Sequence, residues 1–262
     1  AARGERPDFQ GFLDQYRHTA ALSVNWVWVG PSGQQERPKG GGVLQLYRRE
    51  MAKAPEFAIR IKGEPGDLMS SRQHASEDAL GELPLAALSK RSDGAKKSAL
   101  RILIGGLGMG FTLAAVLRKL DELQNLADVY VAELVPGVVA WNQNTIGACA
   151  GHPLNDSRAK VLAADVYRVI ERAESEYDAI LLDVDNGPEG LTHEHNHRLY
   201  STEGLSLALE ALRPGGLLAV WSAGPEPAFT ARLAKVGFDV KEHRVRAHAG
   251  KGARHVIWIA KK

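Results

Sequence analysis

The chain has 262 residues, of which 44% are hydrophobic and 24% are charged. This composition is ordinary for a globular protein and too apolar for a disordered one. A formal net charge of +2 argues against a dedicated nucleic-acid-binding protein. The single cysteine cannot form an internal disulfide, and no apolar run reaches the length of a membrane span. Because the first residues also lack the apolar core of a signal peptide, we expect a cytoplasmic protein without membrane or nucleic-acid partners.

Residues 1–94 are expected to form a small, β-rich N-terminal domain with a helix near its end. Three runs alternate as strands do, and a Gly/Pro-rich loop separates the first two. These runs are residues 23–30, 41–50 and 56–63. The stretch 70–88 has helical spacing of its leucines, and Ser76, Glu77 and Asp78 give it an acidic, cap-like start.

Residues 95–262 are expected to form a second, larger domain in which apolar strands alternate with amphipathic helices. The expected strands are 99–106, 128–133, 159–165, 177–183 and 217–223, followed by a final pair at 238–247 and 255–262. The expected helices are 111–120, 136–144, 166–173, 201–213 and 227–238, and a Pro-Gly-Gly turn closes the fourth of them. This alternation predicts an α/β fold, with a doubly wound parallel sheet and a C-terminal antiparallel strand pair.

A glycine-rich loop follows the first strand of this larger domain. It contains Gly105, Gly106, Gly108 and Gly110 within six residues. Glycine lets the backbone approach a ligand closely, and the next helix offers free N–H groups, so we expect a nucleotide-type ligand rather than a plain turn. Phe111 stands where a dinucleotide-binding loop has its third glycine, which disfavours NAD.

Acidic residues end the next three strands, at the edge where such sheets bind ligands. Glu133 is a candidate for the ribose hydroxyls, or else an ordinary solvated acid. Asp165 is a candidate for the adenine amino group, for the N-cap of the following helix, or for both. Asp183, Asp185 and Asn186 could hold a cationic amine and accept its proton; the alternative is simple turn chemistry.

Three alternating histidines, His193, His195 and His197, follow this turn. A metal site is one interpretation of them, and a polar loop over the site is the other. No cysteine lies nearby, and we expect no metal.

Five runs together resemble the spermidine synthase (polyamine aminopropyltransferase) family, over roughly residues 55–260. These runs are RILIGGLGMGFTLAAVL, VYVAELVPGVVAWNQ, AADVYRVI, YDAILLDVDNGPEG and ALRPGGLLAVW. The resemblance implies a Rossmann-like fold of the class I methyltransferase-like superfamily, with a small N-terminal β domain and a homodimer. It also implies a transferase of polyamine biosynthesis that uses decarboxylated S-adenosylmethionine as co-substrate and a small-molecule amine as acceptor.

The resemblance further implies a role for individual residues. The donor would be bound by Gly105, Gly106, Gly108, Gly110, Glu133, Leu134, Asp165 and Val166. Asp183, assisted by Asp185, would take the proton from the attacking amine. Glu77, Asn186 and Tyr200 would face the amine substrate.

Three positions depart from the family pattern, and each loses an expected side chain. Gly108 replaces the aspartate that holds the donor's amino group, Asn186 replaces a second aspartate, and Ser76 replaces an aromatic residue. The loss of negative charge leaves intact S-adenosylmethionine open as the donor, with Arg72 as the counter-charge of its carboxylate, and hence a methyltransferase. A non-catalytic nucleoside-binding protein is the alternative from another class, and an NAD-dependent oxidoreductase ranks last.

Overall fold

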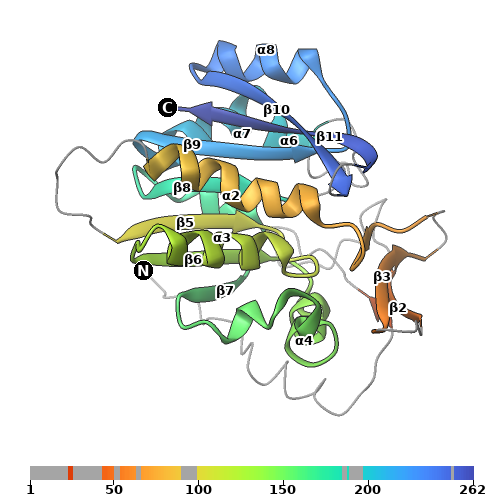
Figure 1. The fold of residues 1–262 in the computed structure, drawn as a ribbon. Coiled ribbons are helices and arrows are strands. Elements are labelled where there is room, and N and C mark those ends of the chain that lie inside the picture. Colours follow the sequence, from red (N-terminus) through yellow and green to blue (C-terminus); the bar gives the residue numbers. More distant parts are fainter. Residues whose placement is uncertain are drawn as a thin grey trace.

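The computed structural model describes residues 23–25, 43–49, 54–62, 66–89, 99–184, 188, 197–248 and 251–262. Within these residues the strands form two sheets, a small one near the N-terminus and a large one that carries most of the helices (Figure 1).

The small sheet has four antiparallel strands in the order β1-β2-β3-β4. Their bounds are β1 Ser23–Asn25, β2 Val43–Arg49, β3 Glu56–Ile61 and β4 Met69–Ser70. Residues 26–30 of the first expected strand lie outside the described residues. Leu46 of β2 and Ile59 of β3 are buried, and they belong to the same hydrophobic core as the central strands of the large sheet. The small sheet therefore packs onto the rest of the protein through apolar contact.

The large sheet has seven strands in the order β10-β11-β9-β8-β5-β6-β7. Their bounds are β5 Leu100–Gly105, β6 Ala127–Glu133, β7 Ala159–Ala163, β8 Tyr177–Leu182, β9 Leu212–Ser222, β10 Asp239–His248 and β11 Lys251–Lys261. Strands β5 to β9 are parallel, and the β10–β11 pair joins the edge of β9 antiparallel. The expected doubly wound sheet and its C-terminal antiparallel pair are confirmed. Its strand order reverses between β5 and β8, and ligands bind at such a switch point.

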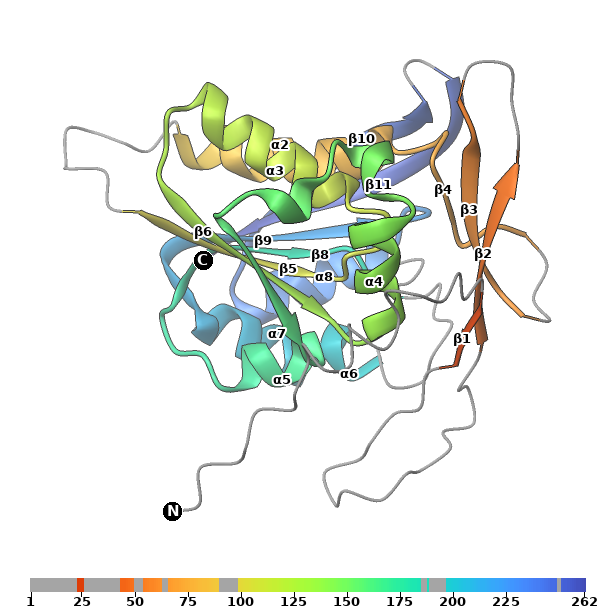
Figure 2. The ribbon, with the colours of Figure 1, turned by 90° about the horizontal axis from the view of Figure 1, so that it is seen from below.

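Helices cover both faces of the large sheet (Figure 2). They are α2 Ala75–Ser89, α3 Phe111–Glu122, α4 Pro136–Asn144, α5 Val166–Glu171, α6 His197–Tyr200, α7 Thr202–Ala211 and α8 Pro227–Val236. Ile102 and Ile104 face the core under α2, α3 and α4, whereas Leu103 between them faces the core under α5, α7 and α8. Apolar residues on both faces explain why the central strands read as continuous hydrophobic runs.

Two details differ from the sequence expectations. Ser76 lies inside α2, because the helix begins at Ala75 and the N–H of Asp78 donates to the carbonyl of His74. The Pro-Gly-Gly segment belongs to β9, because the strand starts at Leu212, directly after α7. The expected domain boundary at residue 94 lies outside the described residues, and the division into 1–94 and 95–262 stays a prediction.

Candidate active site

Two cavities adjoin at the carboxyl ends of the central strands. The larger has a volume of about 570 Å³ and the smaller about 170 Å³. Four residues line both of them: Leu68, Met69, Gly108 and Asp183. The two spaces therefore meet at the glycine loop and at the carboxyl group that follows β8.

Gly106 lets the glycine loop lie directly against the backbone of Asp183, at the start of the loop that follows β8. Its φ is +88°, and a Cβ built on it would lie 2.4 Å from the carbonyl oxygen of Asp183, so no other residue fits. The N–H of Asp183 donates to the carbonyl of Gly105 at 2.9 Å, and the N–H of Gly106 donates to that of Ala132 at 2.9 Å. These contacts set the position of Asp183 through the backbone.

Glu133 joins the glycine loop to the loop after β6. Its Oε2 accepts the N–H of Leu107 at 2.9 Å, and its Oε1 accepts the N–H of Val135 at 2.7 Å. Burial raises the pKa of Glu133, and the backbone N–H groups oppose that rise. The backbone N–H groups of both loops thus converge on this one carboxyl group. Glu133 and Leu134 both line the smaller cavity, as a ribose-binding site would require.

Asp165 lines the smaller cavity beside Val166, at the end of the next strand. It is the N-cap of α5, because its Oδ1 accepts the N–H of Tyr167 at 2.9 Å, which confirms the capping interpretation. Its other oxygen pairs with Arg198 at 2.5 Å, and that guanidinium lies 4.4 Å from the centre of the Tyr167 ring. Sequence reasoning missed Arg198, which is 33 residues away and has no motif of its own.

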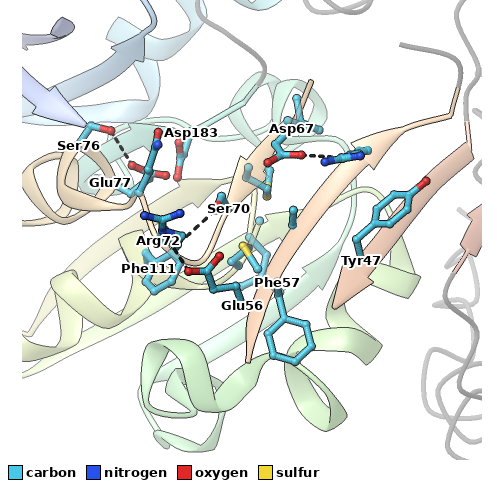
Figure 3. A pocket seen from close by; sticks show the side chains of 18 of the residues that line it. Tyr47, Glu56, Phe57, Asp67, Ser70, Arg72, Ser76, Glu77, Phe111 and Asp183 are labelled. Atoms are coloured by element: carbon cyan, nitrogen blue, oxygen red, sulfur yellow. Dashed lines mark hydrogen bonds and ion pairs between the residues drawn. The ribbon is translucent and has the colours of Figure 1, made fainter. Parts of the chain in front are cut away.

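Asp183 and Glu77 form a carboxyl pair in the wall of the larger cavity (Figure 3). Thr112 donates its hydroxyl to Asp183 at 2.6 Å, and Ser76 donates its hydroxyl to Glu77 at 2.6 Å. Burial raises the pKa of Asp183 to about 6, against the opposing effect of Thr112. Burial and the nearby charge of Asp183 raise the pKa of Glu77 to about 7. The pair can therefore hold or release a proton near neutral pH.

The rest of the larger cavity comes from three separate parts of the chain. The small sheet contributes Arg60, which pairs with Asp67 at 2.6 Å (Figure 3). The turn before α2 contributes Arg72, which pairs with Glu56 at 3.1 Å. The far wall contains Trp221 of β9 and His255 of β11. Of these residues, sequence reasoning gave a ligand-binding role only to Arg72, and it placed Trp221 in the core.

Gly108 lies under Met69, at the place where the cavities meet. Its φ is +53°, and a Cβ built on it would lie 3.1 Å from the Sδ of Met69. The side-chain amide of Asn142 donates to the Gly108 carbonyl at 2.8 Å and holds the loop from below. The side chain of Met69, from the small sheet, fills space that a longer side chain at position 108 would need.

Some expected site residues lie elsewhere or cannot be placed. Asp185, Asn186, His193 and His195 are outside the described residues. Tyr200 is buried, donates its hydroxyl to the carbonyl of Val184 at 3.0 Å, and is not among the described residues that line either cavity. Its substrate role stays a prediction, as do the roles of Gly105 and Gly110, which flank the cavity-lining part of the loop.

The described part of the chain has neither a metal-binding cluster nor a membrane-spanning helix. No cluster of three or more His, Cys, Asp or Glu side chains there is arranged to bind a metal ion. None of the described helices combines the length and apolar character that crossing a membrane requires.

The strand order, the glycine loop and the acidic strand ends define a Rossmann-like protein of the class I methyltransferase-like type. The family model of the spermine/spermidine synthase domain matches residues 80–231, which is more than half of the chain. The chain belongs to this family, as the sequence predicted.

Curated relatives match part of the chain. The chain is 31% identical over 124 residues to a polyamine aminopropyltransferase of Korarchaeum cryptofilum, covering 47% of this chain and 36% of the relative. It is 31% identical over 126 residues to polyamine aminopropyltransferase 1 of Streptomyces coelicolor, covering 47% of this chain and 22% of the relative. The chain thus spans only about a third or less of the length of these relatives.

Solved structures agree over most of the chain. The spermidine synthase of Thermotoga maritima superposes with a TM-score of 0.60 at 13% identity, covering 93% of this chain and 80% of that one. A spermidine synthase in complex with the transition state analogue AdoDATO gives the same score and coverage at 14% identity. At this identity the likeness shows the fold alone.

Proposed function

We propose that this protein is a transferase that moves an alkyl group from an S-adenosylmethionine-type sulfonium donor to an amine. By resemblance to its relatives the group is aminopropyl, and the donor is decarboxylated S-adenosylmethionine. The observation that carries the proposal is the position of Asp183, whose partly buried carboxyl group lines both adjoining cavities. One cavity can hold the donor, and the other can present the amine to it.

The smaller cavity supports a nucleoside. Its polar wall consists of the glycine loop, Glu133 and Asp165. Carboxylate oxygens at these two positions suit the hydroxyl groups of a ribose and the amino group of an adenine. Gly108 places no side chain of its own between the loop backbone and the sulfonium, which would lie beside Met69.

The reaction needs one proton acceptor and precise alignment. The amine nitrogen attacks the carbon attached to the sulfonium, the C–N bond forms, and the C–S bond breaks with its electron pair left on sulfur. For aminopropyl transfer the sulfur product is methylthioadenosine. The proton lost by the amine goes to Asp183, whose raised pKa makes it a stronger base near neutral pH. Positioning and charge stabilisation account for the rest of the catalysis, and no covalent intermediate is required.

Methyl transfer from intact S-adenosylmethionine is the second candidate, and Gly108 and Arg72 favour it. Gly108 carries no acid that would repel the donor's carboxylate, and Met69 covers the position. Arg72 lines the same cavity as Gly108 and can act as a counter-charge. With this donor the sulfur product would be S-adenosylhomocysteine.

Calorimetric titration with four nucleosides tests both candidates. Tighter binding of decarboxylated S-adenosylmethionine and methylthioadenosine would support aminopropyl transfer. Tighter binding of S-adenosylmethionine and S-adenosylhomocysteine would support methyl transfer. Binding without turnover on any amine of a panel would favour a non-catalytic nucleoside-binding protein, and binding of none of the four would contradict the donor site. Glu133→Gln is the control variant, since it should weaken all four ligands together.

A further inference from the structure

Two nitrogen atoms beside the larger cavity have no hydrogen-bond partner among the residues that the structure describes. They are Nε1 of Trp221 and Nδ1 of His255, and both are shielded from solvent. Their rings line the cavity and lie together, with centroids 4.9 Å apart and planes tilted by 57°. Native proteins keep few unpaired buried polar groups, because each one destabilises the fold. A bound group that supplies the missing partner would explain both atoms.

The sheet places these two residues in a row with Asp183. Leu182 of β8 is paired in register with Val220 of β9, so Asp183 and Trp221 follow at neighbouring positions. On the other side of β9, Trp221 is in register with Ile257 of β11, two residues after His255. Adjacent strands lie about 4.8 Å apart, so the row from β8 to β11 spans about 10 Å. An elongated acceptor could therefore contact Asp183 at one end and the two rings at the other.

Hydrogen-bond chemistry excludes an ammonium group as the partner of the indole in this row. The indole N–H of Trp221 only donates, and an ammonium group also only donates. The distal ammonium of a diamine would therefore leave the indole N–H unpaired. A carboxylate oxygen accepts from the indole. Burial lowers the pKa of His255, and its neutral ring donates to the same carboxylate in the tautomer that carries the proton on Nδ1.

The charges around the cavity agree with this chemistry. The described lining residues include four arginines and four carboxyl groups, so their formal charges cancel. They are Arg48, Arg49, Arg60 and Arg72, with Glu56, Asp67, Glu77 and Asp183. A site for a dication would carry an excess of negative charge, whereas a balanced site suits a ligand with one group of each sign.

We propose that the acceptor is an amine that also carries a carboxylate, with its amine at Asp183 and its carboxylate at Trp221 and His255. This inference rests on the transferase function proposed above and names the substrate class of the same site. A chain of about four carbon atoms that includes the carboxylate carbon, with a hydrogen bond at each end, matches a row of about 10 Å.

Two probes of equal chain length test the proposal on the full chain saturated with methylthioadenosine. The probes are 4-aminobutanoate and 1,4-diaminobutane, which differ only in the distal group, and calorimetry measures their binding. We expect 4-aminobutanoate to bind at least about tenfold tighter. Trp221→Phe keeps the ring and removes the N–H, so it should weaken 4-aminobutanoate about tenfold and leave 1,4-diaminobutane within about twofold.

Two further sets of variants separate a loss of hydrogen bonding to the ligand from a general disturbance of the structure. His255→Asn keeps a donor close to the position of Nδ1 and should retain more affinity for 4-aminobutanoate than His255→Phe does. Tyr130→Phe removes a hydroxyl group outside both cavities and should change neither probe.

Tighter binding of the diamine, or an equal loss of both probes in Trp221→Phe, would overturn the proposed acceptor class. Failure of methylthioadenosine to bind would contradict the aminopropyl form of the proposed function instead. The same two titrations on the nucleoside-free protein would then still decide the acceptor class.

Discussion

The smaller and larger cavities take most of their polar side chains from different parts of the chain. All the polar side chains of the smaller cavity follow consecutive strands of one parallel sheet, from the glycine loop to Asp183. The larger cavity combines the small sheet, the start of α2, the glycine loop and two strands at the far side of the large sheet. The polar wall of the smaller cavity depends on the ends of neighbouring strands, although part of its apolar wall, including Leu44 and Ile59, comes from the small sheet. The polar wall of the larger cavity depends on how remote segments pack.

This difference separates nucleoside binding, which many proteins of this fold share, from the selection of a particular acceptor. Strand ends of a doubly wound sheet can bind a nucleoside in many proteins, because the geometry belongs to the fold. The walls that select an acceptor belong to no single motif, and here they bring arginines, an indole and an imidazole beside the carboxyl pair. Fold alone therefore does not identify the acceptor.

The largest effect is expected at Asp183, where the two cavities meet. Asp183→Asn should lower turnover at least about 10²-fold, because the amide cannot take the proton from the amine. Nucleoside binding, measured by calorimetry, should survive. Asp128→Asn, which removes only an exposed ion pair with Lys160, is the control and should keep full activity. An unchanged rate in Asp183→Asn would exclude this residue as the base.

A second prediction concerns the backbone that joins the cavities. Gly106→Ala should lower the free energy of unfolding by roughly 2–4 kcal/mol, since the new Cβ clashes with Asp183 and φ is positive. Gly151→Ala is the matched control: its φ is +73°, but a Cβ there has open space, so only the strain of about 1 kcal/mol remains. Urea unfolding measures both variants, and equal losses would show that the contact with Asp183 is unimportant.

A third prediction sharpens the comparison at Gly108. Gly108→Asp combined with Met69→Ala should shift donor preference about tenfold toward decarboxylated S-adenosylmethionine, because the new carboxylate attracts an ammonium and repels a carboxylate. Met69→Ala makes room for the side chain. Gly108→Asn with Met69→Ala has nearly the same shape without the charge and should show no such shift in competitive titrations. An equal shift in both would point to shape instead of charge.

The pH dependence of turnover is a fourth prediction. Asp183 accepts a proton only when ionised, so kcat/KM should rise as pH passes through about 6 and fall about tenfold per unit below it. Glu77 adds a second step near pH 7 in the wild-type profile. In Glu77→Gln the upper step should disappear and the lower one remain. A profile with both steps unchanged would show that Glu77 does not titrate with the site.

The pH dependence of the free energy of unfolding should have the opposite sign to that of turnover, although the same two carboxyl groups cause both. The usual values of 3.8 for Asp183 and 4.5 for Glu77 rise to about 6 and about 7 on folding, so the folded state binds more protons between about pH 4 and 7. The free energy of unfolding should therefore fall as pH rises through this window. Glu77→Gln should flatten the dependence in urea unfolding at pH 5 and pH 8. A stability that increases with pH to the same extent in both proteins would contradict the raised pKa values.

The sequence by itself determined the large sheet and the polar strand ends that are proposed to bind the nucleoside. When apolar strands alternate with amphipathic helices, few arrangements bury both faces of the resulting sheet. The order of the strands then brings the glycine loop, Glu133, Asp165 and Asp183 to one edge of that sheet. The capping role of Asp165 was also readable, because an N-cap is a local interaction.

Only the tertiary structure decided the larger cavity and its electrostatics. Arg198 reaches Asp165 across 33 residues, Met69 covers Gly108 from another sheet, and Trp221 meets His255 through strand pairing. Burial of Asp183 beside Glu77 raises both pKa values, and burial depends on every segment that packs around the pair. Such contacts have no periodicity or spacing in the sequence, because they arise from the packing of segments that are distant along the chain.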